Sequence, residues 1–191
     1  MDIKTELKKL IDELIQSRRE LNQLLFDEDG TPDLLGEPCS PRQLAELQRV
    51  LAKPLPPSYR AFLEIHNGWD KFSGANKILS VEDQSESWVV VQVEKFHALF
   101  EEFGGKDPFR AGAIPVVMGE NERTYLVLDP RKVRPNGEMD LIWFDYTQED
   151  RRYSDFVSFL RSELRLVREM IEDEKKGSTT GQATQDEQDE D

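Results

Sequence analysis

The feature that most constrains this fold is the stretch from Leu55 to Trp69, in which both ends of a short helix can be recognised. Pro56 and Pro57 suit the start of a helix, because the first helical residues have no N–H partner in any case. Apolar side chains follow at helical spacing, and Asn67 and Gly68 can adopt the left-handed conformation that ends a helix. The stretch therefore predicts a helix of about ten residues that buries one face in a core.

Helical and strand patterns divide the rest of the chain into two kinds of segment. Helices are predicted over residues 2–26, from Ser40 to Lys53, over 90–103 and from Ser154 to about residue 173. Strands are predicted over residues 78–81, 113–118, 124–129 and 139–146, with loops over 69–76 and 130–137. Pro115 indicates an edge strand or a strand start. Helices followed by short strands and a last helix predict a single α+β domain with a mostly antiparallel sheet and flanking helices.

Three segments are expected along the chain. Residues 1–30 form an amphipathic helix that packs on the core or extends from it, and residues 31–173 form the domain itself. Residues 174–191 are polar and acidic, with one apolar side chain, so we predict a disordered tail. The broad apolar stripe of residues 2–26 favours packing on the domain, and pairing with a second copy of the chain is the alternative.

The charge balance bears on partners. The formal net charge is −14, and residues 172–191 carry −6 of it through eight acids and two lysines, which leaves −8 on the rest. An acidic body repels nucleic acid, so direct binding to DNA or RNA is not expected. It would speed association with a basic protein, although excess carboxylate could equally serve solubility alone. No signal peptide and no membrane span are visible, so we expect a cytoplasmic protein with no membrane partner.

Catalytic and metal-binding patterns are missing from the sequence. The chain has two histidines, His66 and His97, and one cysteine, Cys39, which has no basic neighbour before Arg42 to lower its pKa. No cluster of Cys, His and acidic residues has metal-ligand spacing, and no glycine-rich loop matches a phosphate-binding pattern. We therefore predict no catalytic residue, no metal and no cofactor, and a protein that is not an enzyme.

Binding is easier to argue from the residues. Trp69 follows the helix-ending glycine in a predicted loop with Asp70 and Phe72, and Trp88 opens an apolar run after several acids. Aromatic side chains bordered by acidic residues are typical of an interface anchor with a charged rim. The alternative is that each tryptophan covers the edge of the core. Asp145, at the end of the predicted strand 139–146, is a further candidate contact.

Residues 40–165 resemble the SUKH superfamily. The resemblance rests on Leu-Pro-x-x-Tyr-x-x-Phe-Leu over residues 55–63, followed by Asn67-Gly68. Later features agree in order: Pro-Val-Val-Met-Gly at 115–119, Tyr-Leu-Val-Leu-Asp at 125–129, Trp-Phe-Asp at 143–145 and Phe-Val-Ser-Phe-Leu at 156–160. The N-terminal helix and the acidic tail lie outside this pattern.

The resemblance implies an α+β domain with a curved sheet that works as a binding module without a common catalytic residue. The superfamily includes a fungal regulator of cell-wall synthesis and many bacterial immunity proteins that neutralise polymorphic toxins. It therefore implies an immunity protein that binds a cognate toxin, and a basic nuclease toxin would suit the acidic body. The alternatives are an intracellular scaffold or regulatory module and, third, an enzyme. The concave face of the sheet and the surroundings of Trp69 are the expected contact surface.

Overall fold

The computed structural model describes residues 2–26, 34–120 and 123–183, with side chains up to residue 176. By their internal contacts the described residues form two units. The sheet unit comprises residues 2–7 and 34–159, and the helical unit comprises residues 8–26 and 160–183.

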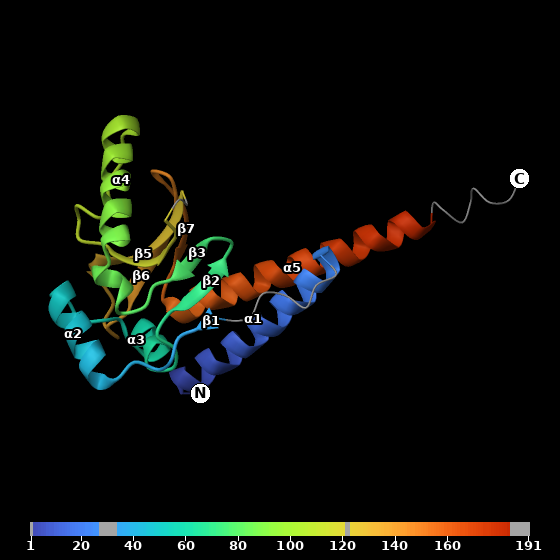
Figure 1. Cartoon of the computed structure of the whole chain (residues 1–191), viewed down its shortest axis with the longest axis horizontal. Helices are drawn as coiled ribbons and strands as arrows, with labels where there is room; N and C mark the ends of the chain where they lie inside the picture. The colour runs from blue at the N-terminus through green and yellow to red at the C-terminus, as the bar shows by residue number, and fades with distance from the viewer. Residues whose placement is uncertain (1, 27–33, 121–122, 184–191) are drawn as a thin grey trace, which may run out of the picture. The chain divides into compact units, whose positions relative to one another are not determined.

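The helices, and the strands other than β4, are labelled in Figure 1. The helices are α1 (Ile3–Phe26), α2 (Pro41–Leu51), α3 (Pro57–Leu63), α4 (Ser87–Phe103) and α5 (Phe156–Ala183), with a 3₁₀ turn at Asp83–Ser85. The strands are β1 (Leu34–Leu35), β2 (Trp69–Ser73), β3 (Asn76–Ile78), β4 (Ile114–Met118), β5 (Thr124–Val133), β6 (Met139–Asp145) and β7 (Gln148–Tyr153). All seven strands pair antiparallel in chain order, from β1 to β7, so the predicted α+β class and antiparallel sheet are confirmed.

Each face of the sheet is covered by aromatic side chains. On one face, α4 packs Phe96 against Tyr125, whose ring stacks on Phe144 with centroids 5.1 Å apart. On the other, Phe159 at the start of α5 contacts Trp143 and Phe72 at centroid distances of 6.2 and 5.6 Å. Alternate residues of β6 therefore serve opposite faces, as the period of two predicts.

The Leu-Pro-x-x-Tyr-x-x-Phe-Leu motif is a core element. Tyr59, Phe62 and Leu63 on α3 are completely buried. Phe156 lies 5.4 Å from the ring of Tyr59 and 4.8 Å from that of Phe62. The helix is shorter than predicted, because it ends at Leu63 and turns occupy the residues before Asn67. Its motif residues thus anchor α3 against the start of α5.

Asn67 and Gly68 join three segments behind α3. The Asn67 side chain accepts a hydrogen bond from Val81 N at 2.8 Å and donates one to Glu82 Oε2 at 2.6 Å. Gly68 has φ +87°, and a Cβ there would lie 2.9 Å from Ile78 O. Only glycine fits this close approach of two backbone segments.

Several predicted helix ends are confirmed and one is corrected. Ser40 caps α2 in a full capping box with Gln43, and α4 ends at Gly104 as predicted, although it begins three residues earlier than expected, at Ser87. The cap of α5 is Asp155, whose Oδ1 accepts from Ser158 N at 2.7 Å, and not the predicted Ser154. A carboxylate at this position also suits the positive end of the helix.

Four strand predictions need correction. The predicted loop 69–76 is largely the β2–β3 hairpin, and the predicted loop 130–137 begins with the end of β5. The short β1 and the charged β7 were not predicted, because neither has an apolar alternation. Pro115 lies in a central strand, so the edge alternative was wrong, but it is the second residue of β4, so the predicted strand start is confirmed. A register shift follows between Pro115 and Val117.

The helical unit pairs α1 with α5, which run side by side in the same direction (Figure 1). Glu13 bonds Arg168 at 2.9 Å, and Glu20 bonds Lys175 at 2.6 Å, seven residues later on both helices. This spacing is that of interhelical ion pairs in coiled coils. α5 continues to Ala183, beyond residue 173 where the predicted last helix ends, and residues 184–191 lie outside the described residues. Extending an existing helix costs less than starting one.

Candidate protein-binding surface

The five predicted contact residues divide by their exposure. Trp69 and Phe72 are core residues of β2, with exposed fractions of 2% and 1%, and their rings meet at 5.3 Å. Asp70 and Asp145 are exposed, and Trp88 is half-buried. Placing Trp69 and Phe72 on a loop was wrong, because both lie on β2. They are three residues apart, so a regular strand would put them on opposite faces. The irregularity of β2 between Trp69 and Ser73, with Lys71 at φ +52°, allows both to be buried while Asp70 is exposed.

Lys77 brings two of these predicted residues together. Its Nζ lies 2.6 Å from Asp83 Oδ1, 3.5 Å from Asp70 Oδ1 and 5.4 Å from the ring of Trp88. Partial burial would lower the pKa of Lys77, but the hydrogen bond and charge of Asp83, with Asp70, outweigh it and raise the pKa. Lys77 is therefore a charged link between β3, the 3₁₀ turn and Trp88.

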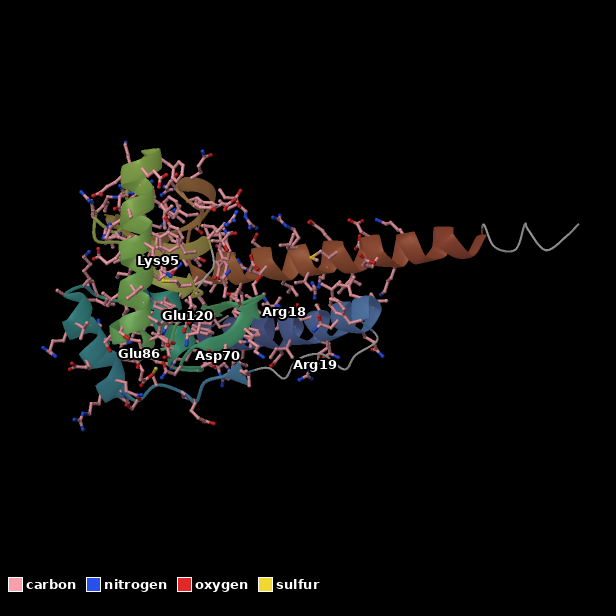
Figure 2. The ribbon with its side chains drawn as sticks, turned by 45° about the horizontal axis from the view of Figure 1, so that its top comes forward. Arg18, Arg19, Asp70, Glu86, Lys95 and Glu120 are labelled. Atoms are coloured by element: carbon pink, nitrogen blue, oxygen red, sulfur yellow. The ribbon has the colours of Figure 1, made fainter. Side chains whose placement is uncertain are left out.

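A groove of about 400 Å³ surrounds this link, and we call it the Lys77 groove. Figure 2 labels Asp70 and Glu86, which are both exposed. Glu82 is fixed on its rim, since Gln43 Nε2 and Asn67 Nδ2 each bond one of its oxygens. Burial would raise the pKa of Glu82, but these hydrogen bonds lower it overall, so the groove has a fixed negative charge. Its lining comprises Leu34, Leu35, Gly36, Asn67, Gly68, Trp69, Asp70, Lys77, Ile78, Ser80, Glu82 and Asp83.

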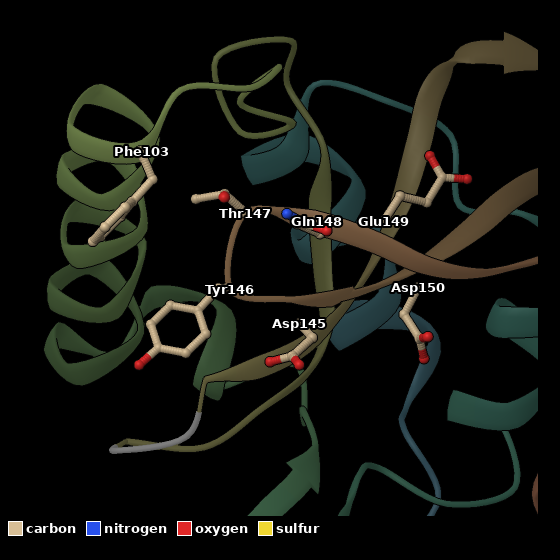
Figure 3. Close-up of a pocket in the computed structure, with 7 residues that line it drawn as sticks. All are labelled: Phe103, Asp145, Tyr146, Thr147, Gln148, Glu149 and Asp150. Carbon is tan, nitrogen blue, oxygen red and sulfur yellow. The ribbon is translucent and has the colours of Figure 1, made fainter.

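A second hollow, of about 610 Å³, lies between the end of α4 and the β6–β7 turn, and we call it the hairpin pocket. Its lining comprises Phe103, Asp145, Tyr146, Thr147, Gln148, Glu149 and Asp150 (Figure 3). Figure 3 shows the carboxylates of Asp145 and Asp150 on one side of the hairpin and that of Glu149 on the other. The sequence indicated Asp145 alone in this region, and the exposure of Phe103 follows only from the way α4 packs.

The turn beside the hairpin pocket is held by specific contacts. Tyr146 has φ +54°, its N–H bonds Arg123 O at 3.1 Å, and the Arg123 guanidinium lies 4.8 Å from its ring. Gly105, after α4, lies beside Thr147, where a Cβ would be in ordinary contact with Thr147 O at 3.4 Å. The pocket is thus bounded by two ordered segments.

Residues with catalytic potential are engaged in structural contacts. Cys39 is buried, and burial, with the charge of Glu82, raises the pKa of its thiol to about 11. A thiol with such a pKa is a poor nucleophile at neutral pH. His66 Nδ1 lies 3.2 Å from Gly36 O, and His97 Nδ1 lies 2.5 Å from Asp107 Oδ2. Within the described ranges, no three Cys, His, Asp or Glu residues are grouped as metal ligands.

Two buried aspartates form the densest charge network. Asp140 pairs with Arg134 at 2.6 Å and with Arg152 at 3.2 Å, and Arg152 also reaches Asp129 at 3.7 Å. Asp129 and Asp140 are 5% and 2% exposed. These arginines compensate carboxylates that would otherwise be buried without a partner, so the network ties β5, β6 and β7 together.

Fold and site together define an α+β module with an antiparallel sheet and two acidic hollows on its surface. The model of the SMI1 / KNR4 family (SUKH-1) matches residues 38–162, and the chain belongs to this family. Members are generally non-enzymatic immunity or regulatory domains that typically bind protein partners. A search of curated proteins finds no significant match to the chain. Over the described residues, no helix is long and apolar enough to cross a bilayer.

Proposed function

We propose that this chain is a cytoplasmic immunity protein, a non-enzymatic module that binds a cognate toxin of a polymorphic toxin system and blocks it. The toxin is a basic domain, and a nuclease is the class whose positive charge would fit best. The observation that carries the proposal is a SUKH-1 module whose two surface hollows are rimmed by exposed carboxylates.

Electrostatics supports a basic partner. Complementary charge raises association rates and disfavours like-charged partners. A toxin must be captured before it acts, so fast association is useful for an immunity protein. The same charge argues against a direct nucleic-acid partner, because the phosphate backbone would be repelled.

A protection assay tests the proposal. Bacterial cells expressing the toxin domain encoded beside this gene should regain growth when the chain is coexpressed, and the two proteins should copurify. A charge-matched control is another acidic SUKH-1 protein from an unrelated locus, which should not protect. If no neighbouring toxin is neutralised, the immunity role is overturned, and a scaffold or regulatory module takes its place.

The proposal extends to the segments outside the matched residues. We propose that residues 1–30 and the acidic tail, 174–191, add partner specificity to the domain over 31–173. Self-association through residues 2–26 remains a prediction. Ile11, Leu14 and Leu21 on α1 are buried in the described structure, whereas Leu24 and Phe26 are exposed. Light scattering on the chain and on a Leu24→Ser, Phe26→Ser variant would test this contact.

A further inference from the structure

The hairpin pocket combines exposed aromatic surface with a free carboxylate. Phe103 is 65% exposed although it lies at the edge of a hollow, which is costly for so large an apolar side chain. The lining contains three carboxylates and no basic side chain. Glu149 and Asp150 are already bound to Arg152 at 2.8 Å and to Arg151 at 2.9 Å. Asp145 has no ion-pair partner among the described residues, so its charge is available.

Tyr146 brings a second aromatic side chain to the lining of the pocket. Tyr146 has positive φ at the first position of the two-residue turn between Asp145 and Gln148, where glycine is the usual residue. Ala52 and Lys71 have similar positive φ values, so this conformation by itself marks no site. Its consequence here is that a tyrosine ring, in place of a glycine, lines the pocket beside Phe103.

These observations agree on the chemistry of the occupant. A partner side chain with a cationic end and an aliphatic stem would pair with Asp145 while its stem covers Phe103. We propose that the hairpin pocket is the anchor site for an Arg- or Lys-bearing segment of the protein partner, with Tyr146 and Phe103 as its apolar contacts. This inference rests on the proposed protein-binding function and names the surface that carries it.

A peptide titration tests the pocket without knowledge of the partner. The probe is acetyl-Gly-Arg-Leu-Arg-Gly-amide, added to the ¹⁵N-labelled full chain at physiological ionic strength, with the Glu-for-Arg peptide as control. Amide shifts should change at residues 101–105 and 145–150 with the basic peptide only. Shifts spread over the acidic surface, or no shifts, would overturn the proposal.

Variants separate binding from folding. Tyr146→Gly relieves the positive φ and should keep the melting temperature while weakening peptide affinity by about tenfold. Lys71→Gly is its matched control, because Lys71 is also a non-glycine residue with φ +52° but lies on β2. Asp145→Asn should weaken binding several-fold, whereas Glu94→Gln, the same charge change on the exposed face of α4, should not. Unchanged affinity in Tyr146→Gly and Asp145→Asn would refute the assignment.

The toxin assay distinguishes failure of the pocket assignment from failure of the immunity role. Phe103→Ala, at an exposed position, serves if Tyr146→Gly does not fold. If the chain neutralises its neighbouring toxin and the pocket variants neutralise it equally well, the pocket is wrong and the immunity role stands. If the wild-type chain neutralises no toxin, the role fails, and the peptide titration still decides whether the pocket binds basic segments.

Discussion

The carboxylate of Glu138 accepts two hydrogen bonds from Ser58, one from its backbone N–H at 2.8 Å and one from its hydroxyl at 2.7 Å. The hydroxyl in turn accepts the N–H of Phe156 at 3.0 Å. Pro56, the cap residue of α3, makes no side-chain cap bond, so Glu138 takes this role from the hairpin before β6. One buried carboxylate therefore joins the starts of α3 and α5 to the sheet.

Removal of the Glu138 carboxylate should destabilise the fold, because the two Ser58 donors that it accepts from would lose their acceptor. Glu138→Ala leaves the buried Ser58 N–H and hydroxyl without an acceptor, which costs about 2–3 kcal/mol. Glu138→Gln keeps one acceptor oxygen and should lose about 1 kcal/mol less. Urea unfolding of both variants measures the difference, and equal stabilities would show that the two bonds contribute little.

Titration of Glu138 should make the stability of the fold depend on pH. Burial, opposed by the bonds from Ser58, raises the pKa of Glu138 above its ordinary 4.5. Between pH 4.5 and the raised value, the folded state keeps a proton that the unfolded state releases, so raising the pH lowers stability. The wild-type chain should therefore lose stability relative to Glu138→Gln as pH rises from 4.5 toward neutrality. A constant difference would contradict the raised pKa.

Substitution of Trp69 should reduce the stability of the fold far more than substitution of its neighbour Asp70. Trp69→Ala removes a large side chain that is 2% exposed and should cost about 3–5 kcal/mol. Asp70→Asn, on the exposed face of β2, should change stability by less than about 0.5 kcal/mol. Thermal unfolding measures both. A small loss of stability in Trp69→Ala would contradict its burial and would favour the predicted surface contact.

The same residues show what the sequence could and could not reveal. Helical periodicity, the capping box of Ser40 and the α3 motif were enough to predict the helices, the fold class and the family. The position of Trp69 was missed because Asp70 and Lys71 break the apolar alternation, and short strands carry little signal. The hairpin pocket was largely invisible because Phe103 and Tyr146 are far apart in sequence, and only the packing of α4 beside β6 and β7 brings them together.

Gly68 should be irreplaceable for a reason that Gly74 does not share. Both have positive φ, +87° and +60°, but only at Gly68 would a Cβ meet backbone atoms, at 2.9 Å from Ile78 O and Ser80 N. Gly68→Ala should cost about 2–4 kcal/mol from strain and displacement together, and Gly74→Ala about 1 kcal/mol from strain alone. Urea unfolding compares them, and equal losses would mean that the neighbouring strand yields easily.

Asp140 should give a pH dependence opposite to that of Glu138. Burial would raise its pKa, but the hydrogen bonds and charges of Arg134 and Arg152 outweigh it and lower the pKa below its ordinary 3.8. The stability that Asp140 contributes is therefore present above pH 3.8 and is lost as pH falls through the lowered value. Asp140→Asn should be about 2 kcal/mol less stable near neutral pH, because it leaves the arginines without their buried partner.

The control for Asp140→Asn is Asp150→Asn, because Asp150 forms an exposed pair with Arg151. This exposed pair should contribute less than about 0.5 kcal/mol at any pH. Urea unfolding should show the Asp140→Asn deficit shrinking below pH 3.8, while the Asp150→Asn difference stays near zero. A deficit that persists unchanged in acid would mean that the substitution acts through packing, and that the charge of Asp140 contributes nothing to holding β5, β6 and β7 together.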